Sequence, residues 1–206
     1  MKQKRKLKKK VVIFLILALA FIIFIGVLIL TNGKKSENKV KVVDEIKEYG
    51  YVLENNKPKQ YKQLFKELVK VLKADKVNEE EYAKLISQMF AVDFYDLNSK
   101  TSKNDIGGIT FISEKSRENF ALKASDTVYK YVEINVSGDR KQELPEVINS
   151  SVKEIKTEKL DKKSVKDDNA YVVTVNLEYK KDLDYPKEVV VKLLHNDKKL
   201  EIYEME

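Results

Sequence analysis

The sequence contains no cysteine, no tryptophan and a single histidine, His195. Without cysteine the chain forms no disulfide, offers no thiolate nucleophile and lacks the lipid-modified cysteine of a lipoprotein anchor. One histidine without cysteine also argues against a zinc site, because these two residue types are the usual zinc ligands. The sequence therefore predicts no bound metal and no cofactor.

Motifs that carry catalysis are missing as well. No glycine-rich phosphate loop follows a predicted strand, and no Gly-x-Ser-x-Gly occurs. The acidic run that includes Asp105 lacks the ligand spacing of a calcium loop. His195 falls at a predicted hairpin turn, where we expect a solvated side chain. We therefore expect a protein that is not an enzyme.

One long apolar run is present, from Val11 to Leu30, with no charge, amide or proline. At about 1.5 Å per residue, a helix of this length spans roughly 30 Å, the thickness of the hydrocarbon core of a bilayer. The run predicts a single-pass transmembrane helix that acts as an uncleaved signal anchor. The alternative is a cleaved signal peptide, whose apolar region is usually about 7 to 15 residues long.

The charges beside this run set its orientation. Segment 1–10 carries seven cations and no acid, whereas Lys34 and Lys35 are the nearest charges on the other side. The positive-inside rule then places the N-terminus in the cytoplasm and residues after Leu30 outside the cell membrane. The tail also contacts anionic membrane lipid. The seven cations are Lys2, Lys4, Arg5, Lys6, Lys8, Lys9 and Lys10.

The tail explains the net charge of +7. Without its seven cations, 33 basic residues stand against 33 acidic ones, so no nucleic-acid partner is expected. Lysine greatly outnumbers arginine, a composition typical of low-GC bacteria, in which "outside" means the space between membrane and wall. We expect a linker at 31–41 and an extracytoplasmic α+β domain at 42–206.

Three helices are predicted in that domain. Apolar spacing indicates a helix from Pro58 to Lys73, and Asn78 with Glu81 forms a capping box that starts a second. Ser113 begins a third helix that runs to Val132. Before them, the segment 42–53 predicts a short helix that breaks at Gly50, and after them the period changes from 3.6 to 2.

The alternating pattern predicts an antiparallel meander of about four strands. A short strand at Ile109–Ile112 precedes it, after a loop, 101–108, whose two glycines imply a turn or a close approach. The strands are Val147–Leu160 with a bulge near Asn149, Tyr171–Tyr179, Glu188–Leu194 and Leu200–Met205, with turns at Lys166–Asn169, Asp184–Pro186 and His195–Lys198.

This order of elements, over Lys57 to Glu206, resembles the nuclear transport factor 2-like (cystatin-like) fold. The resemblance implies three helices packed on a curved antiparallel sheet, a cone that hosts enzymes, binding proteins and interaction modules. Together with a basic tail and one membrane helix, the chain resembles the bitopic assembly subunits of type IV secretion and conjugation machines. Enzymes that share the fold use an aspartate inside the cone.

Asp93 stands out for this reason, because it occupies an apolar position on the second helical face, eleven residues after Tyr82. Asp93, Asp96, Tyr61 and Tyr82 are the candidate ligand-binding residues. The alternative is that Asp93 and Asp96 face water or cap the next turn, and that the tyrosines are core residues. A buried, unpaired Asp93 would have a raised pKa.

These observations favour a non-catalytic, membrane-tethered interaction or scaffold module, as in a secretion, conjugation or cell-envelope complex. It would contact other envelope proteins through an open sheet face or a terminal strand edge. The alternative is a small-ligand or wall-fragment binding domain with an Asp-containing pocket. A sensor is disfavoured by the short cytoplasmic tail, and the oligomeric state stays open.

Overall fold

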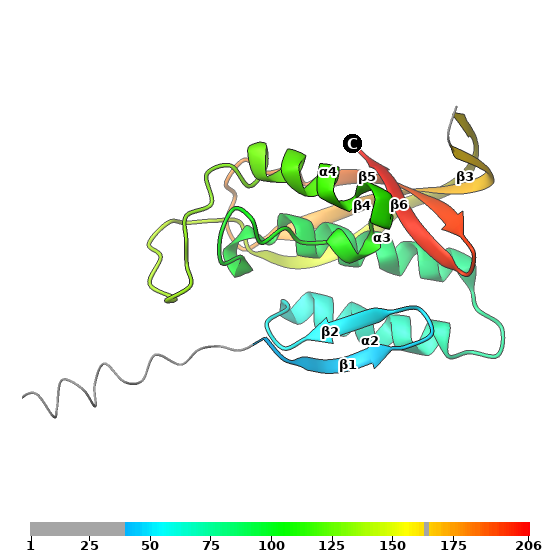
Figure 1. Ribbon diagram of the computed structural model, residues 1–206, viewed down its shortest axis with the longest axis horizontal. Helices are drawn as coiled ribbons and strands as arrows, with labels where there is room; N and C mark the ends of the chain where they lie inside the picture. The colour runs from blue at the N-terminus through cyan, green and yellow to red at the C-terminus, as the bar shows by residue number, and fades with distance from the viewer. Residues whose placement is uncertain (1–39, 163–164) are drawn as a thin grey trace, which may run out of the picture. The chain divides into compact units, whose positions relative to one another are not determined.

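The computed structural model describes residues 40–162 and 165–206, and the chain divides into two units after residue 39. The second unit is an α+β domain in which three helices pack with a four-stranded antiparallel sheet (Figure 1). The predicted tail and membrane helix lie outside the described residues. Within the described ranges, no helix is long and apolar enough to cross a membrane.

The first two predicted helices are confirmed. Helix α2 (Lys59–Leu72) follows Pro58, and α3 (Glu79–Tyr95) begins after Asn78, whose Oδ1 accepts the N–H of Glu81 at 3.1 Å. Every residue of α3 from Met89 onward is buried, so its C-terminal half forms the centre of the core rather than an amphipathic surface. A short 3₁₀ turn, η1 (Leu97–Ser99), follows it.

The third helix, α4 (Glu114–Asp126), is confirmed but ends earlier than predicted. Its Phe120 packs against Phe90 and Phe94 of α3, with ring centroids 6.0 and 5.5 Å apart. Tyr129 leaves the helical path because its hydroxyl donates to the carbonyl of Phe94 at 2.6 Å. Residues 127–146 therefore form a long loop instead of a helical end.

The main sheet is the predicted antiparallel meander, in the order β3-β4-β5-β6. The pairing of β3 with β4 shifts register three times, and the first shift, between Val147 and Asn149, lies at the predicted bulge. Val173, Val175 and Leu177 of β4 are buried, as their alternation predicts. The strands are β3 (Val147–Lys162), β4 (Val165–Tyr179), β5 (Glu188–Asn196) and β6 (Lys199–Met205).

The helix predicted at 42–53 is wrong, because this segment forms a separate antiparallel hairpin, β1 (Val42–Ile46) and β2 (Tyr51–Glu54). Gly50 occupies the turn with φ +65°, a conformation that glycine adopts without strain. The hairpin buries Tyr51 against Tyr82 and Phe111, with centroids 6.4 and 5.6 Å away. Packing on α3 thus selects the alternating pattern over the helical one.

Three local predictions also need correction. Ile109–Phe111 forms a 3₁₀ turn, η2, and only Ile112 makes a β-bridge, to Ile202. The segment Lys166–Asn169 belongs to β4 and is not a turn. His195 lies in β5, and the turn after it is made by Asp197, with φ 52°, and Lys198.

Candidate functional site

Asp93 forms a buried ionic node with two lysines that come from different parts of the chain. Its Oδ1 lies 2.7 Å from Nζ of Lys100, and its Oδ2 lies 2.8 Å from Nζ of Lys57. Oδ2 also accepts the backbone N–H of Gly108 at 2.8 Å. The Asp93 side chain is 4% exposed, so these contacts are almost fully removed from solvent.

The charges of the node determine how Asp93 ionises. Burial alone would raise the pKa of Asp93, but Lys100 and then Lys57 outweigh burial and lower it to about 2. The carboxylate is therefore ionised and ion-paired at neutral pH, which makes it a weak general base. The alternative that Asp93 and Asp96 both face water is wrong, since each residue is 3% exposed.

The two glycines of the 101–108 loop fit closely against this node, as the sequence predicts. A Cβ on Gly107 would lie 1.9 Å from the backbone oxygen of Asp93. The N–H of Gly107 donates to the hydroxyl of Tyr129 at 3.0 Å. Because Tyr129 in turn donates to α3, the loop is fixed on the helix from two sides.

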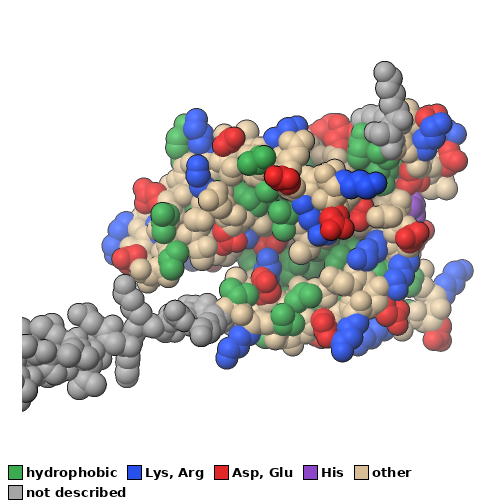
Figure 2. Space-filling view, viewed as in Figure 1, with side chains coloured by type: hydrophobic (Ala, Val, Ile, Leu, Met, Phe, Trp, Pro, Cys, Tyr) green, Lys and Arg blue, Asp and Glu red, His purple; other side chains and the backbone are tan. Residues whose placement is uncertain are grey.

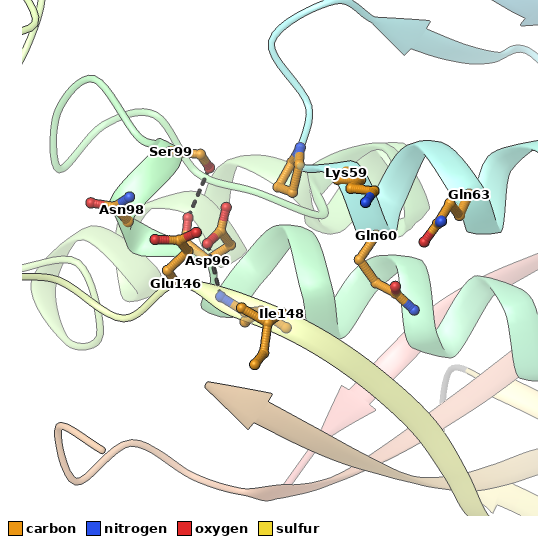
Figure 3. Close-up of a pocket in the computed structure, with 10 residues that line it drawn as sticks. Lys59, Gln60, Gln63, Asp96, Asn98, Ser99, Glu146 and Ile148 are labelled. Carbon is orange, nitrogen blue, oxygen red and sulfur yellow. Dashed lines mark hydrogen bonds between the residues drawn. The ribbon is translucent and has the colours of Figure 1, made fainter. Parts of the chain in front are cut away.

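Asp96 caps the C-terminal end of α3 and lines an open groove beside it (Figure 3). Its Oδ1 accepts the N–H of Val147 at 3.0 Å. Burial raises the pKa of Asp96, the bond from Val147 opposes this rise, and nearby Glu146 adds to it. The groove has a volume of about 440 Å³. Its polar lining includes Lys59, Gln60, Gln63, Asn98, Ser99 and Glu146.

The two candidate tyrosines are core residues. Tyr82 is 1% exposed, its hydroxyl lies 2.5 Å from that of Tyr51, and it accepts the N–H of Leu200 at 3.2 Å. Tyr61 is 3% exposed, and Nζ of Lys57 lies 5.4 Å from its ring centroid. Of the four candidate residues, only Asp96 lines the groove, so the structure does not bring them into one pocket.

His195 takes part in a polar cluster that the sequence analysis missed. Its Nδ1 lies 2.8 Å from Oδ2 of Asp167, and its Nε2 lies 3.5 Å from Oε1 of Glu79. Burial would raise the pKa of Asp167, but N–H groups of His195 and Asn169 and the imidazole lower it. Asp167 is 28 residues away along the chain, so only the pairing of β4 with β5 brings the two together.

The polar groups of the core satisfy one another. Within residues 40–162 and 165–206, every buried side-chain nitrogen or oxygen has a hydrogen-bond partner. In the same ranges, no three histidine, cysteine or acidic side chains are grouped so as to hold a metal ion. Comparisons with protein-family models, curated proteins and solved structures found no match to this chain.

Proposed function

We propose that the chain is a non-catalytic interaction module, held at the outer face of the cell membrane by Val11–Leu30. Its domain has a nuclear transport factor 2-like fold and contacts other envelope proteins, as in a secretion, conjugation or cell-envelope complex. The packing of three helices with a four-stranded antiparallel sheet supports this fold. The use of Asp93 in ion pairs supports a role in contact rather than in chemistry.

The outer edge of β1 carries this proposal. Among the described strands β1 pairs only with β2, and four of its five residues are exposed. Val42 is 61% and Val43 57% exposed. Figure 1 shows β1 along the border of the domain. A strand edge of this kind offers backbone donors and acceptors to an added strand.

In the main sheet, the outer edges of β3 and β6 are less suited to strand addition. The pairing of β3 with β4 is interrupted by three register shifts, against one between β1 and β2, and β3 carries Lys153, Lys156 and Lys159, which are features that discourage edge pairing. In β6, Ile202 already forms a bridge to Ile112. The partner best matched to β1 is an extended segment with apolar and basic side chains, because β1 exposes two valines followed by two acids.

Photocrosslinking in intact cells tests this proposal. A photoreactive amino acid at position Val43 is expected to form an adduct with another envelope protein, whereas the same group at Leu122, exposed on α4, is not. Adding Val42→Lys should abolish the adduct, because a charged side chain at the edge hinders strand addition. Recovery of monomer alone from position 43 would contradict the proposal.

A second candidate function is the binding of small ligands or wall fragments in the Asp96 groove. Its support is the polar lining of the groove, to which Asp96, Gln60 and Gln63 all contribute (Figure 3). Titration of soluble disaccharide-peptide wall fragments into the full chain should give heat of binding that Gln63→Ala reduces. Lys198→Ala, away from the groove, is the matched control. Equal heats from the two variants would exclude this function.

A further inference from the structure

The loop 127–146 exposes three large side chains in sequence proximity: Tyr131 is 76%, Ile134 76% and Val136 81% exposed. We infer that this loop lies in the outer leaflet of the membrane and holds the domain with that end against the lipid. The inference rests on the membrane anchor of the proposed function, but it concerns a different surface and a different partner from β1.

The length of segment 31–39 limits how far the domain can lie from the bilayer. The predicted membrane helix ends at Leu30, and the described domain begins at Val40, so segment 31–39 joins the two. Nine residues span at most roughly 30 Å when fully extended. The point where the chain enters the domain therefore stays within this distance of the bilayer surface.

The start of the domain, at Val40 and Lys41, is linked by polar contacts to α3. The N–H of Lys41 donates to Oδ1 of Asn55 at 2.9 Å, and the N–H of Asn55 donates back to Lys41 at 2.9 Å. Two residues later, Lys57 forms its ion pair with Asp93. The start of the domain and the C-terminal end of α3 are thus held together by polar contacts.

The exposed loop is fastened to the same end of α3. Lys100, the second partner of Asp93, accepts a hydrogen bond at its carbonyl from Nη1 of Arg140 at 2.9 Å. The N–H of Asn135 donates to the carbonyl of Thr101 at 2.7 Å. Figure 1 shows the loop before β3 and the start of β1 at one end of the domain's long axis. The end of the domain that follows the predicted anchor is therefore the same end that carries the exposed apolar loop.

The side chains of the loop suit contact with lipid. Tyrosine is enriched at membrane interfaces, where its ring is buried and its hydroxyl stays hydrated. Nζ of Lys130 lies 5.2 Å from the ring centroid of Tyr131 and can reach lipid phosphate. The charged side chains of Glu133 and Asp139 limit how deeply the loop enters the membrane. Ile134 and Val136 therefore reach only the boundary between headgroups and acyl chains. Figure 2 shows hydrophobic side chains among charged ones at this end.

The absence of cysteine allows a direct test with single-cysteine variants of the full chain. Ile134→Cys and Leu122→Cys, labelled with an environment-sensitive fluorophore, are reconstituted into vesicles of phosphatidylethanolamine and phosphatidylglycerol. Leu122 is 59% exposed on α4 and is the matched control. At position 134 we expect blue-shifted emission, quenching by doxyl-labelled lipid and severalfold weaker quenching by aqueous iodide than at position 122.

Flotation of the vesicles separates failure of the inference from failure of the proposed function. If the protein floats with the vesicles and both labels are quenched equally by iodide, the lipid contact of the loop is wrong while the anchor stands. If the protein does not float, the anchor fails and the inference with it. A photoreactive group at Ile134 that captures a protein instead of lipid in cells would also overturn the inference. Adding Val136→Asp should abolish the blue shift at position 134.

Discussion

Nζ of Lys100 lies 2.7 Å from Oδ1 of Asp93, and both side chains are only 4% exposed. The pair joins the last turn of α3 to the loop that follows it, and Lys57 adds the segment before α2. Burial of charge is unfavourable unless each ion is paired, so this node stabilises the arrangement only while it is complete. Its integrity is the first property to test.

Replacing Asp93 with asparagine is expected to destabilise the domain strongly. Lys100 would remain buried without its counter-ion, and breaking a buried pair typically costs about 3–5 kcal/mol. Lys153→Met, which removes an exposed and solvent-screened pair with Glu188, should have a much smaller effect on stability. Urea unfolding measures both free energies. A loss for Asp93→Asn no larger than for Lys153→Met would show that the node does not stabilise the fold.

The ionisation of Asp93 predicts acid sensitivity. Its pKa is lowered to about 2 from an ordinary 3.8, so its contribution is complete above pH 4 and is lost as pH falls toward 2. The stability difference between the wild type and Asp93→Asn should shrink by roughly 2 kcal/mol across this window. Urea unfolding at a series of pH values measures it.

Asp96 provides the control of opposite sign for this pH series. Burial raises the pKa of Asp96, so this carboxylate binds a proton more readily in the folded state than in the unfolded state. Protonation of Asp96 therefore favours the folded state as pH falls. The difference between the wild type and Asp96→Asn should therefore not shrink on acidification. Parallel curves for the two variants would contradict the assigned ionisation states.

Substitution of Gly107 by alanine is expected to disrupt the fit of its loop on α3. The new Cβ would lie 1.9 Å from the backbone oxygen of Asp93, and strongly overpacked sites lose about 1–3 kcal/mol or more. Gly138→Ala is the control, because φ at Gly138 is +75° but no atom lies within 4 Å of its added Cβ. Its strain alone should cost about 1 kcal/mol. Thermal unfolding that ranks Gly138→Ala as the more harmful change would refute the close approach.

Loss of the hydroxyl of Tyr82 should cost more than loss of that of Tyr51. Tyr82→Phe leaves the N–H of Leu200 without its acceptor, and a buried unsatisfied donor costs about 1–3 kcal/mol. Tyr51→Phe removes only the bond between the two hydroxyls. Denaturant unfolding of both variants, with exposed Tyr131→Phe as control, measures the difference. Equal losses of stability would show that only the hydrogen bond between the two hydroxyls matters, and not the bond from Leu200.

The elements that could be predicted from the sequence are those specified by neighbouring residues. Asn78 and Glu81 specify the start of α3 by a local hydrogen bond, and alternation from Tyr171 to Tyr179 specifies the buried face of β4. The sequence does not predict the hairpin of β1 and β2, because segment 42–53 contains both the helical and the alternating spacing of apolar residues. Only packing of Tyr51 on Tyr82, 31 residues later, decides between them.

The candidate site was less predictable because its partners are distant in sequence. The sequence marks Asp93 as an acid at an apolar position, but Lys57 lies 36 residues earlier and no local pattern connects the two. The pair of His195 and Asp167 likewise depends on strand pairing. Tyr131 is exposed because α4 ends at Asp126. The sequence pattern predicts a longer helix that includes Tyr131, so it does not predict this exposure.

The place of β1 at the start of the domain also governs how the module responds to mechanical load. If the chain is anchored as proposed, force from the membrane would enter at Val40, act first on the two hydrogen bonds between Lys41 and Asn55, and then on the pair formed by Val42 and Glu54. Pulled from this end, an antiparallel hairpin opens one pair at a time, while the helices and main sheet stay folded. A partner strand bound along β1 would be loaded in shear, with several hydrogen bonds resisting together, so occupied and vacant modules would differ in mechanical strength.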